Sequence, residues 1–263
     1  MPQIPALARS PMVLEDLLKT VNLPDQAFDP NGDWENSYVL WWIPFASDPR
    51  VPVTYTHKGP YRRPMGALKL RRERVGDGAA KLEVKLLAST LDGFHNRVQA
   101  TIICAADSLS TPREWSQVSE MLDRNLDLVR GMRILSTGRF SGRRVARVVE
   151  GKRHAISVDR PLTGAWCLFD ALQRLPVDAM APLRFDMLEE MDLHKPEQTL
   201  SPLGSADFEF ASGSARLRGF RQTGRGILPY EYWLDDKQRL VLAVSGLRAY
   251  VFSVDAPQVR MLK

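Results

Sequence analysis

The sequence is built from short runs in which apolar and polar residues alternate, and each run ends in a turn signal. The run Lys81–Leu86, for example, places leucine or valine at every second position between charged residues, and the glycine-rich triplet 76–78 precedes it. A period of two is that of a β-strand with one buried face and one wet face. Roughly ten such runs follow one another, which predicts a mainly β protein.

Two segments have helical spacing instead. Met12–Val21 repeats leucine and valine at intervals of three and four, and Pro161–Leu175 does so with tryptophan and phenylalanine on one side. Pro176 ends the second segment, and Thr163 is positioned to cap it. A short helix with large apolar side chains on one face needs a sheet to cover it.

The predicted fold class is therefore mainly β (α+β), with one large curved antiparallel sheet or open barrel wrapped around one or two short helices. Residues 1–33 form an N-terminal helix and lead segment, and residues 34–263 form a single curved β-sheet domain.

Residues 113–130 are compatible with two structures. Thr111-Pro112-Arg113-Glu114 has the form of a capping box with proline in the first turn, which favours a helix. Val118, Leu122 and Leu126 also share one face of a strand, so both alternatives remain open at this point.

Positive charge is concentrated in two windows. Residues 50–74 and 130–153 each hold eight Lys or Arg and a single Glu, so each window carries +7, whereas the whole chain carries +5. Arginine clusters of this kind bind anionic partners, although charged runs are also common on ordinary solvated surfaces. The candidate anion-binding residues are Arg62, Arg63, Arg71, Arg72, Arg143 and Arg144.

Aromatic residues supply a second candidate site. Trp41 and Trp42 are adjacent, so a strand sends them to opposite faces, and Tyr230 and Tyr232 share a face that Trp233 does not. Such side chains line an amphipathic cavity or pack a barrel core. The candidate ligand-binding residues are Trp41, Trp42, Tyr230, Tyr232 and Trp233.

No motif assigns a catalytic residue. The sequence has no Gly-x-Ser-x-Gly elbow, no His-Glu-x-x-His and no Walker loop, and its four histidines are not paired with other ligand types at metal-binding spacing. We expect no metal site and no cofactor. We expect His194 in a polar loop between strands, which makes it the histidine most suited to act as a base. Cys104 and Cys167 both lie in apolar runs, which predicts two buried free thiols or one disulfide.

The C-terminal hundred residues resemble an exported bacterial family of unknown function. The matching features are Trp166–Leu172 leading to Arg174-Leu175-Pro176, and Tyr230–Asp236 leading to Arg239-Leu240. Members of this family are thought to fold like the lipoprotein carrier LolA, as an unclosed antiparallel barrel around helices. The resemblance implies that residues 113–130 are strand.

Two functions are compatible with these features. The first is a non-enzymatic envelope or ligand-binding protein that holds an apolar or amphipathic ligand, such as a lipid or lipoprotein, or a protein partner, with peripheral membrane contact. The second is a hydrolase or lyase acting on an anionic polysaccharide. No nucleic-acid partner is expected, because no recognition motif accompanies the arginines. The expected location is periplasmic or exported if a signal peptide was removed, and otherwise cytoplasmic.

Overall fold

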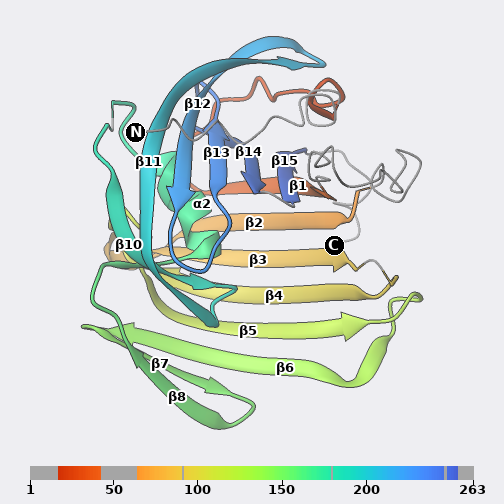
Figure 1. Ribbon diagram of the computed structural model, residues 1–263, viewed down its shortest axis with the longest axis vertical. Helices are drawn as coiled ribbons and strands as arrows, with labels where there is room; N and C mark the ends of the chain where they lie inside the picture. Colours follow the sequence, from red (N-terminus) through yellow and green to blue (C-terminus); the bar gives the residue numbers. More distant parts are fainter. Residues whose placement is uncertain (1–16, 43–63, 91, 179, 246–247, 254–263) are drawn as a thin grey trace, which may run out of the picture.

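The strands of the protein join into one sheet that curls around helix α2 (Ala165–Arg174) (Figure 1). The computed structural model describes residues 17–42, 64–90, 92–178, 180–245 and 248–253. The sheet has 15 strands in the order β8-β7-β6-β5-β4-β3-β2-β1-β15-β14-β13-β12-β11-β10-β9. Neighbours are antiparallel except β9 and β10, which are parallel.

The strands follow the chain almost in order. Their bounds are β1 Trp34–Trp42, β2 Gly66–Arg74, β3 Ala80–Ser89, β4 His95–Cys104, β5 Pro112–Leu122, β6 Leu128–Ser141, β7 Arg144–Val149, β8 Lys152–Ser157, β9 Leu162–Gly164, β10 Leu183–Glu189, β11 Leu193–Phe210, β12 Gly213–Thr223, β13 Tyr230–Leu234, β14 Leu240–Ser245 and β15 Arg248–Phe252. A 3₁₀ turn, η2 (Gly76–Gly78), joins β2 to β3.

The sheet is open, because its end strands β8 and β9 do not pair with each other. Its first and last strands in the chain, β1 and β15, are neighbours in the middle of the sheet. The predicted fold class is therefore confirmed: the protein is mainly β, with one large, unclosed sheet around a short helix. Within the described ranges, none of the helices has the length and apolar character needed to span a bilayer.

Residues 113–130 are not a helix: they form β5 up to Leu122, a turn at 123–127 and the first residues of β6, in agreement with the strand that the resemblance implied. β5 pairs with β4 on one side and with β6 on the other, so two flanking strands take up its backbone hydrogen bonds. Pro112 of the apparent capping box is the first residue of β5, where proline is tolerated. Tertiary pairing outweighs the local helix signal here.

Helix α2 is buried on nearly every side. Its buried residues include Trp166, Leu168, Phe169 and Leu172, which fill the space enclosed by the sheet. The helix begins after Gly164, and the Thr163 hydroxyl does not cap it but donates to the carbonyl of Leu109 at 2.6 Å.

An ionic cluster fastens α2 to the sheet. Asp170 of the helix lies 2.9 Å from Nε of Arg72 on β2 and 3.1 Å from Nε of Arg174. Ser110 donates its hydroxyl hydrogen to the same carboxylate at 2.5 Å. Both Arg72 and Asp170 are buried, so each charge is stabilised by the other rather than by water.

The two cysteines meet in the core. Cys104 of β4 and Cys167 of α2 are buried free thiols whose sulfur atoms lie 3.7 Å apart.

The segment before β1 also packs on the sheet, because Leu18 and Val21 are buried and the Val21 carbonyl accepts the amide hydrogen of Ala211 at 2.9 Å. Residues 1–16, which hold the first half of the predicted helix Met12–Val21, lie outside the described residues.

Candidate functional site

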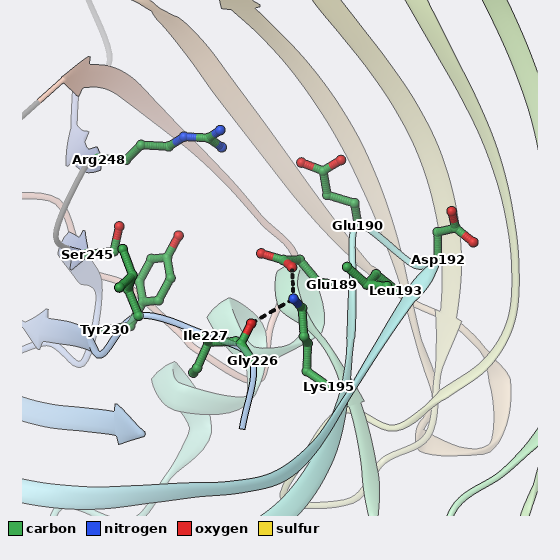
Figure 2. A pocket seen from close by; sticks show the side chains of 11 residues that line it. Glu189, Glu190, Asp192, Leu193, Lys195, Gly226, Ile227, Tyr230, Ser245 and Arg248 are labelled. Carbon is green, nitrogen blue, oxygen red and sulfur yellow. Dashed lines mark hydrogen bonds and ion pairs between the residues drawn. The ribbon is translucent and has the colours of Figure 1, made fainter. Parts of the chain in front are cut away.

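A cavity of about 510 Å³ opens where the β10–β11 turn meets the β12–β13 loop and the ends of β14 and β15. Figure 2 shows its walls: Tyr230, Ser245 and Arg248 on one side face an acidic turn and Lys195 on the other. Apolar side chains complete the lining, namely Leu193, Ile227 and Leu228. The cavity therefore combines charged groups with apolar surface.

The acidic turn has an unusual backbone. Glu190 and Met191 both have positive φ angles, 48° and 57°, and the amide of Asp192 donates to the carbonyl of Glu189 at 3.1 Å. Two consecutive left-handed residues form the hairpin turn that Asn-Gly normally occupies. Neither Glu nor Met favours this conformation, and such strain clusters at functional sites. Met191 is buried in the core, which holds the turn in place.

The turn directs the Glu190 carboxyl group into the cavity, toward the guanidinium of Arg248 on the opposite wall (Figure 2). Burial raises the pKa of Glu190, and the positive charge of Arg248 only partly offsets that effect. Burial alone would lower the pKa of the Arg248 guanidinium. The neighbouring Tyr250, Tyr230 and Glu190 outweigh that effect, so the pKa of Arg248 is raised. The cavity thus holds a carboxyl group that protonates readily opposite a permanent cation.

A second charge pair lies on the cavity wall. The ammonium group of Lys195 on β11 is 3.2 Å from the carboxylate of Glu189 on β10 and donates to the carbonyl of Gly226 at 2.7 Å. These two contacts tie the β10–β11 hairpin to the β12–β13 loop. They set the width of the cavity at this side (Figure 2).

Aromatic rings continue from the cavity into the core. Tyr230 stacks on Tyr232 with ring centroids 5.8 Å apart, and Phe169 of α2 makes edge contacts with Tyr232 at 6.1 Å and with Tyr250 at 5.7 Å. Burial raises the pKa values of Tyr230 and Tyr232, so their hydroxyl groups stay neutral and donate hydrogen bonds. Through Phe169, helix α2 therefore packs against the aromatic side chains behind the cavity.

A chain of buried amides links this aromatic layer to the loop at the mouth. The Tyr232 hydroxyl donates to Gln222 at 2.7 Å, and the Gln222 amide donates to Gln198 at 3.0 Å. The Gln198 amide in turn donates to the carbonyls of Pro196 and Arg225, at 2.8 and 3.2 Å. These bonds fix the β12–β13 loop, because a broken link would leave a buried polar group unpaired.

The predicted aromatic residues lie in different places. Tyr230 lines the cavity, and the buried Tyr232 lies behind it. Trp233 is on the other face of β13, as its alternation predicts, and packs against Phe208 at 4.9 Å. Trp41 of β1 is half-buried against the core, and the side chain of Trp42 lies outside the described residues.

The predicted arginines do not gather on one described surface. Arg71 is exposed and lies 2.5 Å from Glu73, whereas Arg72 is buried against Asp170. The exposed Arg143 and Arg144 belong to the β6–β7 hairpin. β7 and β2 are five strand spacings apart in the sheet, which is about 24 Å measured along it. Arg62 and Arg63 lie outside the described residues.

His194 belongs to β11 rather than to a loop. The register between β10 and β11 shifts next to Pro196, which accommodates the proline inside the strand. Nε2 of His194 lies 3.3 Å from the buried carboxylate of Asp186. Nowhere in the described part of the chain are three or more His, Cys, Asp or Glu side chains grouped to hold a metal ion.

Sequence reasoning missed all five charged residues that line the cavity: Glu189, Glu190, Asp192, Lys195 and Arg248. The one available signal was the run Glu-Glu-Met-Asp at positions 189–192, between two strand-like segments. That run has no Gly, Asn or Pro to mark a tight turn, so the turn was visible only as a gap between strands.

Comparison with known proteins gives a likeness in structure alone. The sequence matches no protein-family model and no curated protein. Among solved structures, the chain is similar to a β-barrel-like protein of the domain of unknown function DUF1849 from Brucella abortus. The TM-score is 0.53 at 8% sequence identity, and the match covers 83% of this chain and 95% of that chain. This similarity shows that the chain has a β-barrel-like fold that also occurs in a bacterial protein of unknown function.

Proposed function

We propose that the protein is a non-enzymatic binding protein whose cavity holds the polar end of an amphipathic ligand, such as a lipid or the acyl-bearing end of a lipoprotein. One observation carries the proposal: charged groups and apolar side chains line the same cavity of about 510 Å³. Specific small-molecule sites combine apolar walls with a few placed polar groups in this way.

The charges suit a polar headgroup. Arg248 and Lys195 offer cationic contacts, and Glu189, Glu190 and Asp192 offer acidic ones. Tyr230, Leu193, Ile227 and Leu228 offer the apolar surface that the first atoms of an acyl chain would cover. A carrier of the LolA type, exported to the periplasm and in peripheral contact with a membrane, is the specific form of this proposal.

Mass spectrometry under native conditions tests the proposal. Protein purified without detergent should carry a mass adduct that disappears after organic extraction, and the extracted protein should bind a fluorescent phospholipid. Tyr230→Asp adds a charge to the apolar wall and should weaken that binding at least about tenfold. The matched control, Arg71→Gln, changes an exposed side chain on β2 and should bind as the natural protein does. Absence of both the adduct and lipid binding contradicts the proposal.

A hydrolase or lyase acting on an anionic polysaccharide is the second candidate. It is favoured by the presence of Tyr230, Glu190 and Arg248 in one cavity, where an arginine pairs with a uronate carboxylate and a tyrosine or carboxyl group moves a proton. Incubation with pectate, alginate and heparin, followed by ultraviolet absorbance and reducing-end assays, tests it. Turnover that Arg248→Lys abolishes would favour this candidate over simple binding.

A further inference from the structure

Half of strand β6 has an edge with which no described strand pairs. β5 pairs with β6 from Arg139 back to Arg133 and again, after a register shift, at Leu128, whereas β7 pairs with β6 only from Ser136 to Ser141. On the side of β6 away from β5, Figure 1 shows the β7–β8 hairpin beside one part of β6 and no described strand beside the rest. Within the described part of the chain, residues 128–134 therefore have no partner on the β7 side of β6, whereas Leu135 is already bonded to Glu150. An unpaired edge presents backbone donors and acceptors that another strand can use.

The orientation of these backbone groups follows from Leu135. Its amide donates to the Glu150 carboxylate at 2.5 Å, and its carbonyl accepts the Glu150 amide hydrogen at 3.0 Å. Alternate residues of a strand direct their backbone groups to the same side. Arg133, two residues earlier, therefore presents its own N–H and C=O to the free edge. Glu150 already shows that a carboxylate fits beside this edge.

The side chains along this edge are apolar and exposed. Met132 is 51% exposed, and Ile134 and Leu135 are each 49% exposed. Ile134 lies on the face of β6 that carries Gly138 against Trp115, and Leu135 lies on the opposite face. Protein edges are normally protected by lysine or proline rather than by such residues. Gly131, with a φ of +77°, kinks the strand and limits the regular edge to Met132–Leu135.

The charge around the edge favours an acidic partner. Four cations lie at this end of the β6–β7 hairpin: Arg130 and Arg133 of β6, and Lys152 and Arg153 of β8. Among described residues, only Arg133 of these four forms an ion pair, with Glu120. A second copy of this chain would bring the same cations against the first and be repelled.

The backbone argues against a lipid surface at the same place. Open strand edges are not tolerated in the hydrocarbon region of a bilayer, because their N–H and C=O groups stay unsatisfied there. A polypeptide in extended conformation satisfies them and covers the apolar side chains as well.

We propose that the Met132–Leu135 edge of β6 binds an extended segment of a partner protein in which acidic and apolar residues alternate, and that this segment becomes an additional strand of the sheet. Its backbone pairs with Arg133. Its apolar side chains cover Met132 and Ile134 on one face, and its acidic side chains meet Arg133 on the other face. This surface is independent of the cavity.

A labelled peptide of alternating glutamate and valine, with blocked termini, tests the proposal by fluorescence anisotropy on the full chain. Saturable binding is expected, together with slower hydrogen exchange at the Arg133 amide. The same peptide with N-methylated backbone amides, or with lysine in place of glutamate, should bind at least about tenfold more weakly. These two peptides test backbone pairing and charge without altering the protein.

Arg133→Pro removes the edge donor and should reduce binding by a similar factor, whereas Arg71→Gln on β2 should not. Circular dichroism establishes that the Arg133→Pro variant is folded; if it is not, the N-methylated peptide decides. Failure to bind, or equal binding of the three peptides, overturns the proposal. It is also overturned if phosphatidylglycerol vesicles bind the protein through this edge, with loss in Ile134→Ser, or if a dimer forms that Arg133→Pro abolishes.

Discussion

Arg72 of β2 and Asp170 of α2 form a buried ion pair, with Nε 2.9 Å from Oδ1. Arg72 is only 5% exposed, and its guanidinium also donates to the carbonyls of Asn31 and Gly32 at 2.7 and 2.5 Å. One side chain therefore joins the lead segment, the sheet and the central helix. Arg71, its neighbour in the sequence, points to solvent.

The first prediction concerns this pair. Asp170→Asn leaves the Arg72 charge buried without its counter-ion and should lower the free energy of unfolding by about 3–5 kcal/mol. Urea denaturation measures the change. Glu73→Gln removes a carboxylate from the exposed Arg71 and should cost no more than about 1 kcal/mol. Equal losses in the two variants would contradict the assigned role of the buried pair.

The contrast between Arg71 and Arg72 shows what the sequence could and could not reveal. The alternation in Lys81–Leu86 identified a strand because one of its faces is wet, and burial follows that pattern. Two adjacent arginines in a basic window look alike, and the partner that buries Arg72 comes from a helix far along the chain. The charge pattern therefore located the two basic windows, but it could not distinguish an arginine buried in an ion pair from an exposed one.

The cavity was hidden for a related reason. Tyr230 and Tyr232 were identified from their alternation, which places them on one face of β13. Glu190 faces the cavity because the turn at Glu190–Met191 adopts left-handed angles that neither residue favours. Only the pairing of β10 with β11, and the burial of Met191, impose that backbone. Local sequence cannot reveal a conformation that tertiary packing enforces.

The second prediction concerns packing on the inner face of the curved sheet. A Cβ atom placed on Gly138 of β6 would lie 2.0 Å from the Trp115 ring of β5, so Gly138→Ala must displace that ring or the strand. The free energy of unfolding should fall by about 1–3 kcal/mol. Gly76→Ala, where no atom lies within 4 Å of the added Cβ, is the matched control and should remain close to the natural protein. Thermal unfolding followed by circular dichroism compares the two.

The third prediction is a pH dependence from Glu190. Burial raises the pKa of its carboxyl group in the folded protein above the ordinary value of 4.5, so the unfolded chain releases this proton first as pH rises. Between about pH 4.5 and the raised pKa, ionisation of Glu190 therefore lowers the free energy of unfolding progressively. Above that pKa the loss is complete. Glu190→Gln should be more stable than the natural protein at neutral pH, and the difference should shrink in acid. Urea denaturation across this pH range measures it; a constant difference would contradict the assignment.

The fourth prediction uses the buried tyrosines. Burial raises the pKa values of Tyr38, Tyr232 and Tyr250 above the ordinary value of 10, so in the folded protein these phenols keep their protons where exposed ones ionise. Because their folded pKa exceeds the unfolded one, stability is lost as pH rises above 10. Ultraviolet titration should show these tyrosines ionising only together with unfolding. Tyr232→Phe removes one of them and should also cost about 1–3 kcal/mol, since Gln222 then loses the donor that lies 2.7 Å away. Reversible ionisation of every tyrosine near pH 10, with the fold intact, would show that the aromatic layer beneath the cavity is open to water.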